Sequence, residues 1–345
     1  MKDERGLEMS SFAFNSQFSI LNSQLSCVAT IGSFDGVHRG HQCLLRQVRG
    51  IADERGLGAM AITFGTSPKK VLGMAGVPQL TSTEERIALL RQAGMDEVAV
   101  LDFTPQMAAM TARDFMKQVL KEQLHVAVLV IGYDHRFGRG RSEGFEDYVR
   151  YGHEMGIEVV RGEACVVDGE PVSSTRIRSL LADGRVDEAA QLLGRPYALS
   201  GHVVGGYREG RKLGFPTANI CPLDANKLIP ADGVYAVWVN VVDNENEDED
   251  ENCHPEENNF HLSSFNFQLR KGMLNIGHRP TLNNGRERSI EVHILDFEGD
   301  LYGKTITVGF VHRLREERTF TSTEALTEQL LQDEKRVREL LNAEE

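Results

Sequence analysis

The first half of the chain alternates short apolar runs with stretches of helical spacing, and this alternation restricts the possible folds most. The apolar runs are Val28–Ile31, Ala59–Thr63, Val98–Leu101, Val126–Ile131 and Ile157–Val160. Strands buried on both faces read as continuous apolar runs, and the helices between them cover a parallel sheet. The sequence up to about Arg161 therefore predicts an α/β domain. Ligands are expected where the carboxyl ends of its strands lead into helices.

The second half of the chain has a different pattern. After about Leu193 the segments become short, rich in β-forming residues and separated by glycines. The candidate strands are His202–Val204, Val234–Val242, Gly272–Ile276, Ile290–Phe297 and Thr305–Val311. This spacing predicts an antiparallel barrel or sandwich. A final stretch, Ser322 to Leu341, places its leucines and valine on one helical face.

These two patterns predict two domains joined by a helical connector. The expected boundaries are a tail over 1–22, a first domain over 23–186 and a second over 187–345. An acidic, Asn-rich insertion over 243–259 falls where a hairpin turn would join two strands, and it has too few apolar side chains to order itself. A solvated loop is the simplest interpretation, since a longer surface loop costs little closure entropy. Binding of a partner is the alternative.

Charge and cysteine content argue against several classes of protein. The formal net charge is −13, and residues 243–257 hold much of the excess acid. The remaining chain is mildly acidic, whereas nucleic-acid binding needs clustered Lys and Arg, so no nucleic-acid partner is expected. No apolar run is long enough for a membrane span, so no membrane partner is expected. The 5 cysteines form no C-x-x-C pair, which favours a cytoplasmic location without a disulfide framework or zinc site.

A glycine-rich loop with two histidines follows the first apolar run and opens a helix. It reads TIGSFDGVHRGH over 30–41. A helix N-terminus offers free N–H groups and a positive dipole to phosphate, and Gly32 and Gly36 permit close approach of the backbone. His38 and His41 face the same way on a first helical turn, where two imidazoles can stabilise charge on one phosphate. The pattern favours adenylyl transfer, with surface histidines or a metal pair as alternatives.

Two further segments suit phosphate chemistry. VSSTRIR over 172–178 combines hydroxyls and arginines at a helix start, which fits the β- and γ-phosphates of ATP. IGYDHRFGRG over 131–140 follows the fourth apolar run, on the expected ligand edge of the sheet. An ordinary N-cap and a plain turn are the alternatives. The presence of the histidine loop favours the phosphate site for the first segment.

A second constellation lies in the β-rich half. GHVVGGYREGRKLGFPTANI over 201–220 ends with Thr217 and Asn219, whose alternate spacing puts both on one side of an extended segment. Their oxygens suit a magnesium ion that keeps phosphates and waters. Glu291 lies in an alternating strand, where a carboxylate can accept a proton from a hydroxyl that attacks the γ-phosphate. A strand-entry loop and an exposed carboxylate are the alternatives.

Together these motifs resemble the bacterial bifunctional riboflavin kinase/FMN adenylyltransferase (FAD synthetase) family. The resemblance runs from about Val28 to Phe320 and includes four more motifs in order: LLGRPY (192–197), GMLNIGHRPTL (272–282), EVHILDF (291–297) and DLYG (300–303). It implies a Rossmann-like HIGH-type nucleotidyltransferase domain, then a six-stranded antiparallel β-barrel riboflavin kinase domain with a C-terminal helix. The implied reactions are riboflavin to FMN and FMN to FAD with release of pyrophosphate, both using ATP and Mg²⁺.

The resemblance also implies roles for single residues. The catalytic residues would be His38 and His41 in the first site and Glu291 in the second. The implied ATP contacts are Gly32, Phe34, Gly40, Ser174, Thr175, Arg176, Gly210, Lys212, Thr217 and Asn219, of which Thr217 and Asn219 also hold Mg²⁺. The implied flavin contacts are Asp35, Asp134, Arg136, Phe137 and Arg315. The partners would be riboflavin, FMN and ATP, and the protein a monomer or weak homo-oligomer.

The chain departs from the family pattern at three places. Ser67 stands where a histidine is common, Tyr133 and His135 stand where Asp and Phe are expected, and the acidic insertion is unusual. The first two departures concern the adenylyltransferase. They leave two other hypotheses open: a kinase with a weak first domain, and a flavin-binding protein with inactive sites.

Overall fold

The computed structural model describes residues 26–65, 73, 76–133, 135–163, 166–167, 169–205, 209–242, 269–280 and 286–343. The expectations for the N-terminal tail, Ser67, Asp134 and the acidic insertion lie outside these ranges. The described residues divide into two compact units. The first unit lies within Met1–Phe34, His41–Gly76 and Leu90–Cys165, and the second within Asp35–Gly40, Val77–Leu89 and Val166–Glu345.

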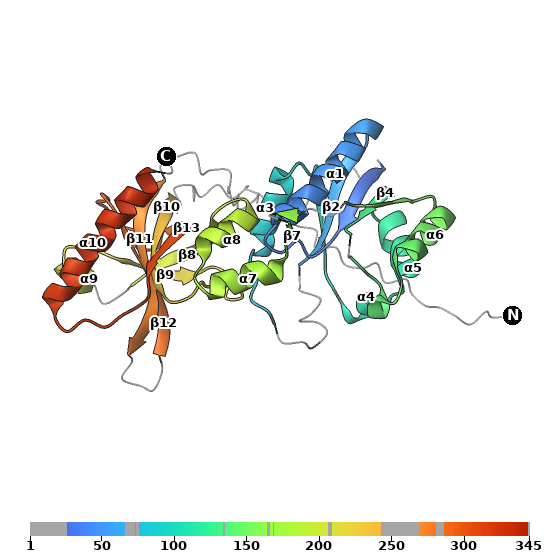
Figure 1. The fold of residues 1–345 in the computed structure, drawn as a ribbon. Helices are drawn as coiled ribbons and strands as arrows, with labels where there is room; N and C mark the ends of the chain where they lie inside the picture. The colour runs from blue at the N-terminus through green and yellow to red at the C-terminus, as the bar shows by residue number, and fades with distance from the viewer. Residues whose placement is uncertain are drawn as a thin grey trace, which may run out of the picture. The chain divides into compact units, whose positions relative to one another are not determined.

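The first unit is built on a five-stranded parallel sheet with the order β3-β2-β1-β4-β5 (Figure 1). The strands are β1 (Cys27–Ile31), β2 (Gly58–Phe64), β3 (Glu97–Leu101), β4 (Val126–Ile131) and β5 (Glu158–Arg161). Each of the predicted apolar runs is a strand, so the predicted parallel sheet is confirmed. The strand order reverses between β1 and β4, and ligands of such sheets bind at that point. The histidine loop follows β1, and the 131–140 segment begins at the end of β4.

Helices and short helical turns connect these strands. They are α1 (Arg39–Arg55), α3 (Thr83–Gln92), α4 (Pro105–Ala109), α5 (Ala112–Phe115), the π-helical turn η1 (Met116–Lys121), the 3₁₀ turn η2 (Arg139–Arg141) and α6 (Phe145–Met155). Helix α1 buries Leu45, Val48 and Ala52 on one face, as its spacing predicts. Ser82 and Glu85, which have the S-x-x-E spacing of a capping box, form one at the start of α3, with reciprocal bonds of 3.2 and 3.0 Å.

The second unit is a closed barrel of six strands in the order β10-β11-β12-β9-β8-β13. They are β8 (Tyr197–Val204), β9 (Ala218–Pro222), β10 (Gly233–Val242), β11 (Arg270–Pro280), β12 (Arg286–Ile294) and β13 (Thr305–Arg315), all paired antiparallel. The described part of the unit also contains the two-stranded pair β6 (Val166–Val167) and β7 (Glu170–Pro171), most of α3, and the helices α7 (Ser174–Ala182), α8 (Val186–Leu193), α9 (Glu209–Lys212) and α10 (Thr323–Asn342). The strand spacing alone left barrel and sandwich open, whereas the family resemblance implied a six-stranded antiparallel barrel with a C-terminal helix, and that expectation is confirmed.

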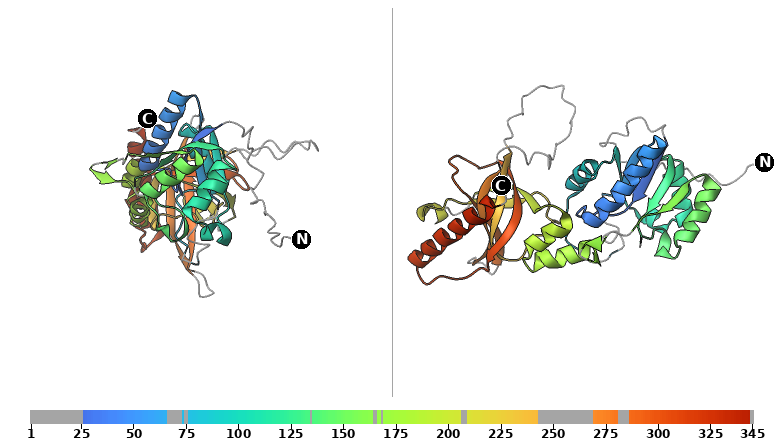
Figure 2. Two further views of the ribbon diagram at one scale, coloured as in Figure 1. Left: turned by 90° about the vertical axis from the view of Figure 1, so that its right-hand side faces the viewer. Right: turned by 45° about the horizontal axis from the view of Figure 1, so that its top comes forward.

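Two apolar clusters organise this second unit. One fills the barrel with alternate side chains such as Tyr235, Leu274, Ile290 and Val292, and it extends over α7 and α8. The other lies on the outside of the barrel, where α10 packs with Val337 and Leu341. Figures 1 and 2 show α10 beside β10 and β11. The expected boundary between 186 and 187 falls inside α8, after its first residue, and α7 and α8 share one core.

One cysteine of the described part is disulfide-bonded. Cys27 and Cys221 are free thiols, whereas Cys43 in α1 is disulfide-bonded. The absence of a C-x-x-C pair in the sequence gave no indication of this bond. A single bonded cysteine among the described residues does not make a disulfide framework.

Candidate active sites

The loop after β1 begins with a tightly packed glycine and phenylalanine. The Gly32 N–H donates to the carbonyl oxygen of Ile62 at 3.0 Å. A Cβ atom on Gly32 would lie 3.1 Å from the ring of Phe34, so that ring covers the glycine. Phe34 is buried at a φ of +46° and makes an edge contact with the ring of His41, whose centroid is 5.2 Å away. Phe34 thereby helps to orient His41 on the first turn of α1.

Asp35 organises the next part of the loop. Its carboxylate accepts hydrogen bonds from the N–H groups of Leu80 and Thr81, at 2.9 and 3.0 Å, and from the Thr81 hydroxyl. It also forms an ion pair with Arg178. The side chain is buried, and these partners use most of what a carboxylate can accept. This geometry indicates that Asp35 holds the loop in place. The resemblance had implied a contact with flavin for this residue.

Gly36 and Val37 hold an unusual backbone conformation. Their φ values are +84° and +36°. A positive φ is easy for glycine, but for a β-branched residue such as Val37 it is a genuine outlier. Such a conformation persists only where surrounding groups enforce it, and strain of this kind concentrates at functional sites. The Gly36 N–H donates to Oγ1 of Thr81 at 3.0 Å, and its carbonyl oxygen accepts from Arg195 at 2.8 Å.

His38 is buried beside this strained turn. A Cβ atom on Gly40 would lie 3.2 Å from the His38 ring and 3.3 Å from the carbonyl oxygen of Val172. Gly40 therefore gives room to the imidazole, whereas the sequence suggested room for the nucleotide. Burial and the positive charge of Arg195 lower the pKa of His38 to about 4. At neutral pH the ring is uncharged, with one nitrogen that donates and one that accepts.

The VSSTRIR motif meets the histidine loop. Helix α7 begins at Ser174, and its N-cap Ser173 accepts from the N–H of Arg176. Oγ of Ser174 donates to the carbonyl oxygen of Asp35 at 2.9 Å, although the residues are 139 positions apart. Arg178, which sequence reasoning did not single out, pairs with Asp35. Its position in the same motif was the available signal.

The remaining members of this motif face outward. Thr175 and Arg176 are exposed at the start of α7. The Arg176 guanidinium lies 2.7 Å from the carboxylate of Glu170, which is itself exposed. An exposed ion pair is weak, so a phosphate can displace it at little cost.

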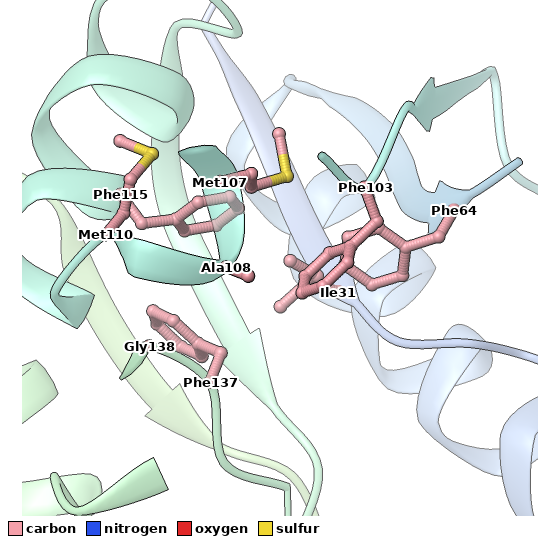
Figure 3. Close-up of a pocket in the computed structure, with 9 residues that line it drawn as sticks. All are labelled: Ile31, Phe64, Phe103, Met107, Ala108, Met110, Phe115, Phe137 and Gly138. Carbon is pink, nitrogen blue, oxygen red and sulfur yellow. The ribbon is translucent and has the colours of Figure 1, made fainter. Parts of the chain in front are cut away.

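The first unit contains an apolar pocket at the carboxyl ends of its strands, shown in Figure 3. Its lining is mostly aromatic and methionine side chains: Ile31, Phe64, Phe103, Met107, Ala108, Met110, Phe115, Phe137 and Gly138. Phe137 stacks on Tyr148 with ring centroids 4.4 Å apart, and Phe64 meets Phe103 edge to face. Of these residues the sequence singled out only Phe137, because periodicity finds core residues without showing which of them line a hollow.

Other residues of the 131–140 segment lie at the surface. Tyr133 is 70% exposed, and Arg136 is exposed as well. His135 lies near Phe137, with ring centroids 6.3 Å apart. Asp134, an expected flavin contact, lies outside the described residues.

The second site brings together the residues that the sequence proposed for it. Oγ1 of Thr217 donates to Oε2 of Glu291 at 3.3 Å. Asn219 on β9 pairs in register with Glu291 on β12, and Asn275 on β11 pairs with it from the other side. Cross-strand partners share a face of a sheet. Because Ile290 and Val292 point into the barrel, these polar side chains lie on its outer face.

The segment before Thr217 is held against β12 by close contacts. A Cβ atom on Gly210 would lie 2.3 Å from the carbonyl oxygen of Phe215, so only glycine allows α9 to fold back here. The Phe215 N–H donates to the Gly210 carbonyl oxygen at 2.9 Å. The Phe215 ring meets His293 edge to face, and Nδ1 of His293 lies 2.8 Å from the carbonyl oxygen of Pro216. Lys212 ends α9, and its side chain lies outside the description.

Arg315 joins β13 to α10. Its Nε and Nη2 atoms lie 2.9 and 2.8 Å from Oδ2 of Asp333, and Asp333 is buried. The family resemblance implies a flavin contact for Arg315. The structure commits its guanidinium to this ion pair, which fastens the C-terminal helix to the barrel.

One further group within the described ranges has metal-binding geometry. Asp232, His278 and Glu317 place one ligand atom each within 4.8 Å of one another. Arg288 already donates to Asp232 at 2.7 Å, and His278 lies 2.9 Å from the same carboxylate. A histidine is a poor partner for Mg²⁺, which prefers oxygen ligands. Thr217 and Asn219 offer the better chemistry for that ion.

Two family models match the chain. The model described as FAD synthetase matches residues 20–176, and the model described as riboflavin kinase matches residues 193–341. The matches follow the order of the two halves expected from the motifs.

Curated relatives match almost the whole chain. The bifunctional riboflavin kinase/FMN adenylyltransferase of Escherichia coli strain K12 is 36% identical over 92% of this chain and 93% of its own length. The proteins of the same name from Listeria monocytogenes and Bacillus subtilis are 33% and 32% identical over similar shares.

A solved structure from Streptococcus pneumoniae also matches. It has a TM-score of 0.77 and 33% identity, and the match covers 91% of this chain and 94% of that one. Its title names a macrolide-efflux protein, an activity that neither family model names. Among the described residues, no helix has the length and apolar character to cross a membrane.

Both families and the curated relatives agree with the two motif sets and with the fold. The chain therefore belongs to the bifunctional riboflavin kinase/FMN adenylyltransferase family, and it is an enzyme that uses ATP to convert riboflavin to FMN and FMN to FAD.

Proposed function

We propose that the two reactions occur at two separate sites, each assembled from a pair of distant motifs. The kinase site consists of Thr217, Asn219 and Glu291. The adenylyltransferase site uses the histidine loop and the start of α7. The observation that carries this proposal is the hydrogen bond from Thr217 to Glu291, because it joins a candidate magnesium ligand to a candidate base across 74 positions of sequence.

In the kinase reaction, Glu291 accepts the proton of the riboflavin 5′-hydroxyl as its oxygen attacks the γ-phosphorus of ATP. The half-buried oxygens of Thr217 and Asn219 fit a magnesium ion, which would neutralise charge on the phosphates when bound. Turning the Thr217 hydroxyl toward that ion would release the Glu291 carboxylate from its present donor. Gly210 and Lys212 are the proposed ATP contacts on α9.

In the adenylyl transfer, a phosphate oxygen of FMN attacks the α-phosphorus of ATP, and pyrophosphate leaves. The uncharged His38 donates one N–H to the phosphates, and His41 provides a second imidazole from the first turn of α1. Ser174, Thr175 and Arg176 contact the leaving pyrophosphate. Gly32, Phe34 and Gly40 remain proposed ATP contacts, in addition to their packing roles. Mg²⁺ is the proposed ion for this step as well.

The aromatic pocket of the first unit is the proposed seat of the flavin ring in adenylyl transfer. A planar tricyclic ring suits a hollow lined by Phe64, Phe103, Phe115 and Phe137. Arg136, exposed beside Phe137, and Asp134 are the proposed polar contacts. Asp35 and Arg315 would have to exchange their present partners to reach flavin. We propose instead that Asp35 holds the histidine loop and that Arg315 fastens α10 to the barrel.

Further proposals concern the domain boundaries, the location and oligomeric state of the protein, and the acidic insertion. We propose an adenylyltransferase domain over 23–186 and a kinase domain over 187–345, in a cytoplasmic protein that is a monomer or weak homo-oligomer. The acidic insertion over 243–259 is proposed to be a solvated loop.

Two single variants test the separation of the sites. His41→Ala should cut FAD formation from supplied FMN and leave FMN formation nearly intact. Asn219→Ala should block FMN formation and spare adenylylation of supplied FMN. Each variant serves as the control for the other, because both activities are measured on one protein. Loss of both activities in either variant, with the fold retained, would contradict two separate sites.

A further inference from the structure

Arg195 lies in the LLGRPY motif, between α8 and β8, and it reaches the histidine loop. Its Nη2 donates to the carbonyl oxygen of Gly36 at 2.8 Å. Its Nη1 lies 3.5 Å from the carbonyl oxygen of Val37 and 3.4 Å from that of Leu193. The function described so far does not use this residue.

The two loop carbonyls that Arg195 binds belong to the strained turn. Gly36 and Val37 are buried, and both have positive φ. A buried carbonyl without a donor costs about 1–3 kcal/mol, so the turn depends on a donor at this position. Charge-assisted hydrogen bonds are stronger than neutral ones, and one planar guanidinium reaches both carbonyls.

Neutral groups also hold the turn: Oγ of Ser174 donates to the Asp35 carbonyl oxygen, and Oγ1 of Thr81 accepts from the Gly36 N–H. Arg195 adds a charged donor to the carbonyl oxygens of Gly36 and Val37. His38 follows directly after Val37, so its imidazole is placed by the conformation of this turn. The charge of Arg195 also acts on His38 and contributes to keeping it uncharged.

Arg195 lies outside the range that matches FAD synthetase. That match ends at residue 176, whereas the riboflavin kinase match begins at residue 193. We propose that Arg195 is a positioning residue for adenylyl transfer: it holds the carbonyls of Gly36 and Val37 and thereby fixes His38, although it belongs to the kinase-matching part of the chain. This inference rests on the proposed role of His38.

The test uses the full-length enzyme with Arg195→Met and Arg195→Lys. FAD formation from FMN and ATP is measured as separate kcat and KM values, and FMN formation from riboflavin is measured on the same samples. Misplacement of a catalytic group by about 1 Å can cost about 100-fold. Arg195→Met should lower kcat for FAD formation by about 10–100-fold, with KM for FMN changed less than about threefold.

Arg195→Lys should recover part of that loss, because an ammonium can donate to one of the two carbonyls. The matched control is Arg49→Met, since Arg49 also donates to backbone carbonyls, those of Gly94 and Leu57, away from the histidine loop. This control should change neither activity by more than about threefold.

Two results would overturn the proposal. One is an unchanged kcat for FAD formation in Arg195→Met. The other is an equal loss of both activities in Arg195→Met and Arg195→Lys, which would mean that Arg195 supports the whole unit. A His38→Gln variant distinguishes a wrong role for Arg195 from a wrong role for His38. Full FAD formation in His38→Gln would show that His38 itself is not needed for adenylyl transfer.

Discussion

Lys227 and Glu85 form a buried ion pair within the second unit, and breaking it gives a large expected loss of stability. Both side chains are 5% exposed. The Glu85 carboxylate also accepts the Ser82 N–H at 3.0 Å, and the Lys227 ammonium lies 5.5 Å from the centre of the Tyr197 ring. Lys227→Met keeps the length and apolar stem of the side chain and removes only the charge that offsets Glu85.

The size of the effect follows from the burial. Removing one partner of a buried pair costs about 3–5 kcal/mol, because the other charge stays uncompensated. Glu85 keeps one backbone donor, so about 3 kcal/mol is expected for Lys227→Met. The double variant Glu85→Gln/Lys227→Met removes both charges and keeps an acceptor for the Ser82 N–H. It should lie within about 1 kcal/mol of the parent protein.

Tryptophan fluorescence in urea measures this difference directly. The chain has 1 tryptophan, Trp238 on β10, so its emission follows unfolding of the barrel. With a urea slope of about 2 kcal/mol per molar, a loss of about 3 kcal/mol lowers the midpoint by about 1.5 M. A shift below about 0.3 M for Lys227→Met, or a double variant no more stable than the single one, would refute this account of the pair.

Three other predictions concern pH, the flavin pocket and the kinase loop. The pKa of His38 is lowered from 6.5 to about 4, so its contribution to folding is complete above pH 6.5 and is lost as the pH falls toward 4. The loss is about 3 kcal/mol, and urea midpoints for His38→Gln should lack it. Phe137→Ala should raise KM for FMN in FAD synthesis about tenfold while riboflavin phosphorylation is unchanged; an unchanged KM would remove the pocket assignment. Gly210→Ala should lower FMN formation by at least about tenfold through the clash with Phe215, and equal loss of FAD formation from FMN would contradict that cause.

The sequence pattern predicted the strands of the parallel sheet, but it could not show whether the strands of the second half close into a barrel. Buried parallel strands such as β1 and β4 were visible as continuous apolar runs, because helices cover both faces of their sheet. The alternation in β10 and β13 is the same in a barrel and in a sandwich. Only the pairing of β13 with β8 and β10, together with the rest of the ring, decides for the barrel.

At the candidate sites, the sequence identified chemistry but not partners. Thr217 and Glu291 meet as expected, because each motif carried its own chemical signal. Arg195 lies in the LLGRPY motif but carried no chemical signal of its own, since an arginine that binds backbone carbonyls looks like any surface arginine until the fold is known. For the same reason the sequence did not show that Gly40 packs against His38 and that Asp35 bonds to Thr81.

The central claim is that phosphorylation and adenylylation use separate residues, and Glu291→Gln tests it most directly. The purified variant is given riboflavin, ATP and Mg²⁺ in one reaction and FMN, ATP and Mg²⁺ in another, and the flavins are separated by chromatography over time. The account predicts FMN formation lowered by at least about 100-fold, with FAD formation from supplied FMN within about twofold of the parent enzyme. FMN formation near the parent rate, or equal loss of both reactions in a folded protein, would contradict it.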